Sequence, residues 1–538
     1  MNKVKPEMKI IFFVVTVLFL IFLFLPMIML FMRSFETDQG FTVTNYINTL
    51  SDTDFLTAIG NSFKVSSVTA LVTTVSAFVM AYAINVTRIF PFLKGVLRTG
   101  ILLPMLLPTI TYGFTIMYSF GNQGLLTRLF GRPLFEIYGF NGLLIGYVIY
   151  TLPPAFLVIH NSFQYIDKRL IVVSKLMGDS PLRSFLNTIV RPLWGTLGGA
   201  FVLSFILSFT DFGIPASIGG TYTVVATQLY QVMLGSIPDF NHGAVIAVIM
   251  LLPALIGIML LHYLEKLNFH YDKLTHIELI QNKWRDIFLG SISLLILVAV
   301  IATFAIMFIA PFLQHYPFNN SFTWEHIIDT FQSNDLTGVY KNSLFVSLLT
   351  AVIGTIVAYG SALLNMRTQL KGKSVMDVIA MMTNTVPGMV LGLSYLFLFN
   401  GTSFKGTFTI LIFCNLVHFF TTPYLMAKNS LSKMNPGWET TGELLGDSWF
   451  KTIYRIIIPN SATTILEMGS YYFINSMVTI SGIIFLITAE TSLVSSKIQQ
   501  LQHFAKFNEI FVLSLLIFVT NLFVKMLFNF LQKRTTLH

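Results

Sequence analysis

Residues 10–32 read IIFFVVTVLFLIFLFLPMIMLFM and contain no charged side chain. An α-helix rises about 1.5 Å per residue, so about 20 apolar residues are enough to cross the hydrocarbon core of a membrane. The apolar core of a secretory signal is shorter and is followed by small residues at a cleavage site, which this stretch lacks. Residues 10–32 therefore predict a transmembrane helix.

The composition of the whole chain extends this prediction. Of the 538 residues, 54% are hydrophobic and only 11% are charged, whereas charged residues make up about 25% of an average soluble domain. A large soluble core is therefore not expected. The formal net charge is +9, which we attribute to Lys and Arg on cytoplasmic loops rather than to a nucleic-acid partner.

Further apolar stretches of spanning length predict an all-α polytopic membrane protein with about twelve transmembrane helices, in contact with membrane lipid. With the N-terminus placed inside, most of the 33 Lys and Arg fall on the inner side. This bias predicts a multi-pass protein of the bacterial plasma membrane with both termini cytoplasmic. The further predicted spans are 62–87, 97–119, 139–160, 194–217, 243–265, 286–311, 342–366, 376–400, 407–427, 461–488 and 508–531.

The chain also repeats short motifs in a fixed order. The matched motifs are Asn61-Ser62 and Asn342-Ser343, Pro108 with Gly113 and Pro387 with Gly392, Asn161-Ser162 and Asn429-Ser430, Gly178-Asp179-Ser180 and Gly446-Asp447-Ser448, and Pro192 and Pro459. Repeated order at large spacing indicates an internal duplication. It predicts halves at 1–270 and 286–538, joined by a polar, basic cytoplasmic linker at 271–285. Six spans in each half make the repeat parallel.

Two inner loops, 161–193 and 428–460, are long and occupy matching places in the two halves. From Trp438 to Pro459 the second loop reads WETTGELLGDSWFKTIYRIIIP, with apolar residues at roughly helical spacing that Gly446 interrupts. This pattern predicts a short helix, a glycine turn and a second helix that ends at a proline.

These loops resemble the EAA loop of binding-protein-dependent ABC importer permeases, whose signature is roughly E-A-A-x-x-x-G, nine residues, then I-x-L-P. Gly446 and Pro459 have the family spacing, whereas the spacing from Gly178 to Pro192 is one residue longer. The positions that match the signature or flank its turn are Val173, Ser174, Gly178, Asp179, Ser180 and Pro192 in the first loop, and Glu439, Thr440, Thr441, Gly442, Gly446, Asp447, Ser448 and Pro459 in the second.

The resemblance covers nearly the whole chain and is strongest to the fused permeases for ferric iron, aminoethylphosphonate and related small anions. It implies the type I ABC importer permease (MetI-like) fold. It also implies that the two loops dock on two copies of a cytoplasmic ABC ATPase and that an extracytoplasmic binding protein delivers the substrate. The substrate would be ferric iron, a phosphonate or a phosphate ester.

Catalytic and cofactor motifs are not found in the sequence. Gly372-Lys373-Ser374 has Arg367 where a Walker A motif needs its first glycine. We therefore expect no enzyme activity and no cofactor in this chain, with ATP and magnesium bound by the partner ATPases. No metal site is expected, and a ligand role for His418 or Glu467 lacks partner ligands at useful spacing.

Polar residues inside predicted spans are candidates for the substrate path. The candidates are Asp211 in the fifth span and Asn475, Ser476 and Thr479 near the matching place in the eleventh. Capping or hydrogen bonding between helices would explain these residues equally well.

The segments 33–60, 312–340, 218–240 and 489–507 are expected on the outer side, where they either dock the binding protein or simply cover the surface. Two other functions stay open at this point. An ion-gradient-driven twelve-helix secondary transporter would need buried coupling carboxylates, and a membrane-embedded enzyme would need a catalytic cluster. The sequence offers little support for either.

Overall fold

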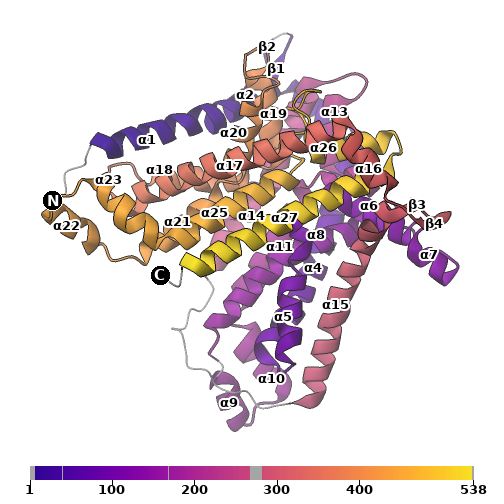
Figure 1. The fold of residues 1–538 in the computed structure, drawn as a ribbon, viewed down its shortest axis with the longest axis horizontal. Coiled ribbons are helices and arrows are strands. Elements are labelled where there is room, and N and C mark those ends of the chain that lie inside the picture. The colour runs from indigo at the N-terminus through magenta and orange to yellow at the C-terminus, as the bar shows by residue number, and fades with distance from the viewer. Residues whose placement is uncertain (1–5, 39, 168, 267–281, 536–538) are drawn as a thin grey trace. The chain divides into compact units, whose positions relative to one another are not determined.

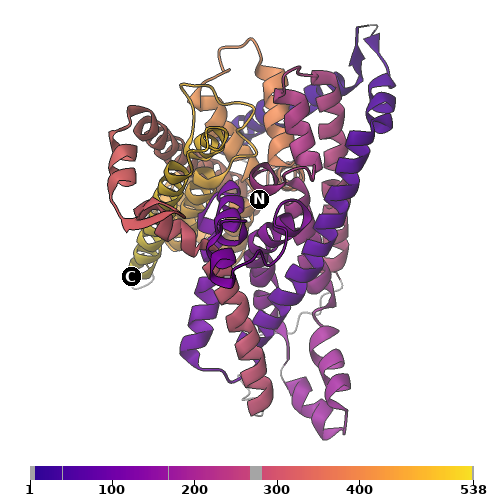
Figure 2. The same ribbon diagram turned by 90° about the vertical axis from the view of Figure 1, so that its right-hand side faces the viewer.

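The computed structural model describes residues 6–38, 40–167, 169–266 and 282–535. This part of the chain is mostly helical, with two short β-hairpins (Figures 1 and 2). The all-α class predicted from the apolar pattern is therefore confirmed. Most of the predicted linker 271–285 lies outside the described residues.

The elements of the first half run from the N-terminus to the linker. They are α1 (Pro6–Phe19), η1 (Leu20–Phe24), α2 (Leu25–Phe35), β1 (Glu36–Thr37), β2 (Gly40–Phe41), α3 (Thr44–Ser51), α4 (Thr53–Val86), α5 (Pro91–Gly100), η2 (Leu103–Leu106), α6 (Thr109–Phe120), α7 (Leu125–Phe130), α8 (Phe140–Ser162), η3 (Phe163–Tyr165), α9 (Arg169–Leu176), α10 (Pro181–Phe185), η4 (Leu186–Val190), α11 (Trp194–Thr210), α12 (Gly213–Ile218), α13 (Val225–Leu234) and α14 (Phe240–Glu265).

The second half repeats much of this order. Its elements are α15 (Lys283–Ile309), η5 (Ala310–Phe312), β3 (Leu313–His315), β4 (Asn319–Phe322), α16 (Glu325–Gln332), α17 (Asn334–Arg367), α18 (Val375–Thr385), α19 (Gly388–Phe399), α20 (Phe408–His418), α21 (Thr421–Ser432), α22 (Gly437–Leu444), α23 (Trp449–Thr452), η6 (Ile453–Ile457), α24 (Ile458–Asn460), α25 (Ala462–Val478), α26 (Val494–His503) and α27 (Phe507–Thr535).

Seven helices in the described residues are long and apolar enough to cross a membrane, and eleven spans result if each of four bent helix pairs counts as one. The remaining predicted span, 461–488, is the eleventh in chain order; it contains α25, which has 17 residues and is followed by a non-helical segment. The helical prediction therefore overran the end of α25 at Val478.

Two predicted spans, 97–119 and 376–400, are sharply broken. The axis turns by 107° between η2 and α6 and by 104° between α18 and α19. Pro108 and Pro387 are the N-caps of α6 and α19, and the residues before them, Leu107 and Val386, have extended backbone angles. A residue that precedes proline is disfavoured in the helical region, which accounts for both breaks.

The chain forms two compact units, which are not the two halves of the sequence. One unit contains Met1–Ile47, Asp239–Leu251 and Ile327–His538, and the other contains Asn48–Pro238 and Leu252–His326. The first span of each half is thus grouped with most of the other half. The sequence boundaries at 270 and 286 stay a prediction about the duplication.

In the first unit, the span α1–η1–α2 packs on α17, α19 and α20. The Tyr395 hydroxyl of α19 donates to the Phe22 carbonyl at 2.5 Å, and the Phe22 ring stacks on Phe413 at 4.2 Å between centroids. The helices α17, α21, α25 and α27 form the rest of this core.

In the second unit, α15 packs on α4 and α6. The Ser119 hydroxyl of α6 donates to the Thr303 carbonyl at 3.2 Å, and the rings of Tyr112 and Phe304 meet edge to face at 5.1 Å. Helices α4, α8 and α11 form the centre of this unit. In each unit, therefore, a first span is held by a helix that begins after a span-breaking proline.

Candidate functional site

The first long inner loop folds as a compact helical hairpin in the second unit. Helix α9 ends at Leu176, and Gly178 takes the left-handed conformation with φ +80°. The Asp179 amide donates back to the Ser174 carbonyl at 3.1 Å, which is the bond that closes a glycine-terminated helix. Figures 1 and 2 show α9 and α10 beyond the ends of the long helices of the same unit.

Side-chain hydrogen bonds and an ion pair then stabilise this turn. The Ser174 hydroxyl donates to Asp179 Oδ2 at 2.7 Å, and Arg183 Nε lies 3.4 Å from Asp179 Oδ1. Ser180 caps α10 by accepting the Arg183 amide at 3.3 Å. The predicted Gly-Asp-Ser signature is therefore a turn whose three residues have separate structural roles.

The second long loop, in the first unit, repeats this geometry. Gly446 also has φ +80°, and the Asp447 amide donates to the Gly442 carbonyl at 2.9 Å. Ser448 caps α23 through the Lys451 amide at 3.3 Å, and the Lys451 ammonium pairs with the Asp447 carboxylate. The predicted helix, glycine turn and second helix are confirmed in both loops.

A π-helical turn follows in each hairpin, η4 in the first and η6 in the second. Pro192 is buried beyond η4, at the 67° bend into α11. Pro459 lies in α24 directly after η6. Because π-turns locally widen a helix, both hairpins join their membrane helix through irregular backbone.

The two hairpins differ in the sizes of the residues at two matching positions, one in the helix before the turn and one in the helix after it. In the second hairpin Gly442 is buried against Thr452, and a Cβ at residue 442 would lie 2.6 Å from Thr452 Oγ1. The matching positions in the first hairpin hold Ser174 and Ser184. The second hairpin thus has a smaller residue on one side and a larger residue on the other.

The side chain of Glu439, the acid predicted to take part in ATPase coupling, points into the protein. Glu439 Oε1 lies 2.7 Å from Arg367 Nε, at the end of α17, and the two side chains are only 15% and 5% exposed. Arg367 also donates to the carbonyls of Met434 and Asn435. This ion pair ties α22 to a membrane helix. The other signature positions, Val173, Thr440 and Thr441, are exposed.

Each hairpin exposes a group of large apolar side chains, a feature that the sequence interpretation missed. Leu176 and Leu444, at matching places before the turn glycines, are 82% and 83% exposed. We call these residues and their neighbours the apolar tips. The first tip consists of Leu176, Met177, Leu182 and Leu186, and the second of Leu444, Leu445, Phe450 and Tyr454. An apolar pair directly before each turn glycine was the available signal.

The four residues predicted to line a substrate path all have partners within their own units. The buried Asp211 accepts the Ile214 amide at 2.9 Å, at the start of α12. In the other unit, Ser476 accepts from Asn415 at 2.8 Å, Asn475 donates to Tyr471, and the Thr479 carbonyl accepts from Ser495. The bonds of Asp211, Ser476 and Thr479 are the capping and interhelical bonds that the sequence left open, whereas the Asn475 bond lies within α25. A role of the four residues in the path stays a prediction.

Among the residues that the structure describes, no group of three or more His, Cys, Asp or Glu side chains lies close enough together to hold a metal ion. His418 and Glu467 are not part of any such group.

Comparison with known proteins identifies the family of this chain. The model of the family described as binding-protein-dependent transport system inner membrane component matches residues 73–268 and again 350–537. The chain belongs to this family. Two matches in one chain make it a fused, two-half permease of an ABC importer, and they confirm the predicted duplication and permease fold. It is a multi-pass inner membrane protein.

Individual relatives agree with this assignment. The ferric transport system permease protein FbpB of Actinobacillus pleuropneumoniae is 25% identical over 505 residues, which cover 90% of this chain and 72% of the relative. The molybdenum transport system permease protein ModB of Azotobacter vinelandii is 29% identical over 192 residues, or 34% of this chain and 82% of the relative.

Among solved structures, that of a bacterial ABC transporter involved in the import of the acidic polysaccharide alginate matches with a TM-score of 0.38 and 16% identity. The match covers 47% of this permease and 98% of the other chain.

Membership of a transport permease family decides against the secondary transporter and the membrane-embedded enzyme considered above.

Proposed function

We propose that this permease carries ferric iron, or a phosphonate or phosphate ester, from an extracytoplasmic binding protein into the cytoplasm. The observation that supports iron is the 25% identity to a ferric transport permease across 90% of this chain. The four polar residues Asp211, Asn475, Ser476 and Thr479 are the proposed contacts along the path. Both termini are cytoplasmic in this proposal, as the distribution of Lys and Arg favours.

The two hairpins are the proposed points at which ATP energy enters. Each presents large apolar side chains on a turn that hydrogen bonds hold rigid, as described above. Burying one exposed Leu or Phe side chain contributes about 1.5–3 kcal/mol. A hairpin tip of this kind therefore gains from insertion into a groove on another protein. Two hairpins favour two copies of a cytoplasmic ABC ATPase, which would bind ATP and magnesium.

Rigidity is what makes such a hairpin useful as a lever. A movement of the docked ATPase is transmitted only if the hairpin does not bend at its turn. Gly178 and Gly446 allow the sharp reversal, while Asp179 and Asp447 hold it through Arg183 and Lys451. The membrane helices α11 and α25 follow the hairpins directly, so the displacement is passed into the spans.

The transport cycle that follows is alternating access. A loaded binding protein docks outside, and ATP draws the ATPases together. The hairpins move, the path opens outward and substrate enters. Hydrolysis returns the path to its inward-open state. The chain itself supplies the path and the levers, and it hydrolyses nothing.

The coupling proposal is tested with the purified complex of permease, ATPases and binding protein. Gly446→Val forces a β-branched side chain into the left-handed region. Asp447→Leu removes the carboxylate that pairs with the Lys451 ammonium. We expect both variants to lose most of the binding-protein-stimulated ATPase activity and transport. Unchanged stimulation and transport in both would refute the role of the hairpin.

The substrate is tested separately, on the binding protein. A thermal-shift screen with ferric iron, phosphonates, sugar phosphates, polyamines and thiamine identifies the ligand that stabilises it. Stabilisation by ferric iron alone, followed by uptake of radioactive iron into vesicles that contain the complex, is the expected result. Stabilisation by a ligand that is neither iron nor a phosphonate or phosphate ester would replace the proposed substrate without affecting the coupling proposal.

A further inference from the structure

The first span of each half leads into the same small structure. After α2 the chain forms the hairpin β1–β2 and helix α3, and after α15 and η5 it forms β3–β4 and α16. Large apolar residues occur at matching places in both, 281 positions apart. We call them the interface stripes: Phe41, Val43, Ile47 and Leu50 in the first, and Phe322, Trp324, Ile328 and Phe331 in the second.

The interface stripes face outward. All eight side chains are between 49% and 68% exposed. The last two residues of each stripe lie three positions apart on α3 or α16, so they share one helical face. Val43 and Trp324 come directly before these helices. The buried residue of α3 is Thr49 and that of α16 is Thr330. Both helices therefore expose their apolar face, whereas a surface helix of a soluble protein turns its apolar face toward the core.

Hydrogen bonds fix this outward orientation in the same way in both copies. Asn45 Nδ2 donates to the carbonyls of Ser34 and Glu36, at 3.2 and 2.8 Å. His326 takes the place of Asn45 in the second copy, and its Nε2 lies 3.1 and 3.0 Å from the carbonyls of Leu313 and Gln314. Each short helix is thus held against the end of its span with its apolar face turned away.

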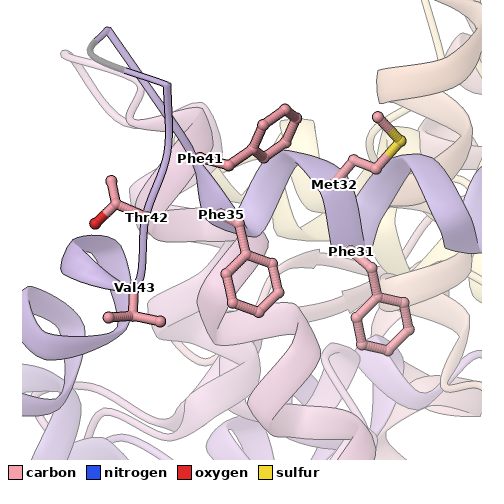
Figure 3. A pocket seen from close by; sticks show the side chains of 6 residues that line it. All are labelled: Phe31, Met32, Phe35, Phe41, Thr42 and Val43. Atoms are coloured by element: carbon pink, nitrogen blue, oxygen red, sulfur yellow. The ribbon is translucent and has the colours of Figure 1, made fainter.

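The first stripe continues the lipid-facing surface of its span. The segment Pro6–Phe35 is strongly apolar and only 33% buried along its most apolar window, so most of that window is available for contact with lipid. An apolar cleft of about 380 Å³ lies between the end of this span and the hairpin. Figure 3 shows the residues that line it: Phe31, Met32, Phe35, Phe41, Thr42 and Val43.

We propose that the two interface stripes insert into the outer interface of the bilayer and anchor the outer ends of the two first spans. Lipid acyl chains fill the apolar cleft beside Phe41. Short helices with an apolar face bind membranes in this way, and Trp is typical of the interfacial layer. Helix α3 carries no charged residue, which suits partial burial among lipids. In this arrangement, 218–240 and 489–507 remain for the binding protein.

Spin labels test the proposal in nanodiscs of phosphatidylethanolamine and phosphatidylglycerol that contain the permease without other proteins. Labels are attached at Ile47→Cys and Ile328→Cys in the stripes. Asn48→Cys and Asp329→Cys, exposed polar neighbours on the same helices, are the matched controls. The native Cys414 is buried, so the wild-type chain gives the unlabelled background. The measured quantity is the collision rate with oxygen relative to that with a water-soluble nickel complex.

We expect this ratio to be several-fold higher at the stripe positions than at the controls, because oxygen concentrates in lipid and the nickel complex stays in water. Equal ratios at Ile47 and Asn48, and at Ile328 and Asp329, would overturn the proposal and leave the stripes as surfaces for a protein partner. Quenching of Trp324 by brominated lipid, with Trp324→Phe as reference, provides the second readout. No transport is measured, so the result is independent of substrate and coupling.

Discussion

Arg367 and Glu439 form an ion pair that joins the end of membrane helix α17 to helix α22 of the second hairpin. The nitrogen and oxygen atoms lie 2.7 Å apart, and both side chains are nearly buried. The first hairpin has Ile171 at the position that matches Glu439, so a corresponding ion pair cannot form there. The two hairpins are therefore attached to their units through different contacts.

Replacing the acid of this pair should destabilise the permease. Glu439→Gln leaves the buried Arg367 guanidinium without its counter-charge, and loss of one partner of a buried pair costs about 3 kcal/mol or more. We expect a clearly lower melting temperature and weaker stimulation of the ATPase. Thermal unfolding in nanodiscs and ATPase assays of the complex measure the two effects.

The double variant Arg367→Met with Glu439→Leu supplies the control for charge. An apolar pair of similar size removes the uncompensated charge, so most of the lost stability should return. Lys433→Gln, at an exposed charge in the same loop, controls for surface charge and should melt like the wild type. A double variant as unstable as Glu439→Gln would show that charge is not the cause.

The contact between Gly442 and Thr452 leads to a second prediction. Gly442→Ser places a side chain within 2.6 Å of Thr452 Oγ1 and should push α22 away from α23. Adding Thr452→Ser recreates the Ser–Ser pair of the first hairpin and should restore function. We expect stimulated ATPase activity to fall in the single variant and to recover in the double variant. Equal activity in both would mean that the hairpin tolerates the change by rotating Thr452.

The apolar tips should control assembly but not folding. Leu444→Asp and Leu176→Asp change side chains that are more than four-fifths exposed, so the permease alone should melt normally. Its affinity for the ATPase should fall about tenfold or more, because a buried Leu contributes about 1.5–3 kcal/mol. Co-purification and titration with the ATPase measure this, with Lys433→Ser as an exposed control. Undiminished binding in both Asp variants would exclude the tips from the interface.

The sequence predicted the parts of this protein that depend on local pattern. The long spans follow from runs of about 20 apolar residues, and the hairpins follow from glycine spacing and helical periodicity. The breaks at Pro108 and Pro387 were missed because a bundle can tolerate proline inside a span. Here the preceding residue adopts an extended conformation instead.

Features that depend on distant contacts could not be predicted in this way. Glu439 looked like a surface acid because its partner, Arg367, lies 72 positions earlier in the chain. Leu444 and Leu445 fitted a helical apolar pattern, which normally indicates burial, yet both are exposed. No local sequence pattern indicates that the first span of each half packs with the other half. All three depend on which surfaces meet after the helices have formed.

The bond between Tyr395 and Phe22 offers the most direct test of that grouping. The Tyr395 side chain is fully buried, and its hydroxyl donates to the Phe22 carbonyl within the π-helical turn η1. Tyr395→Phe keeps the ring and removes only the donor. Hydrogen bonds between membrane helices contribute about 0.6 kcal/mol on average and up to about 1.7, and a buried carbonyl at an irregular turn belongs at the upper end. We therefore expect a loss of about 1 kcal/mol in unfolding free energy in nanodiscs. Tyr263→Phe, at a tyrosine that is 62% exposed, should change nothing, and equal stability of the two variants would show that the first span is held by ring packing alone.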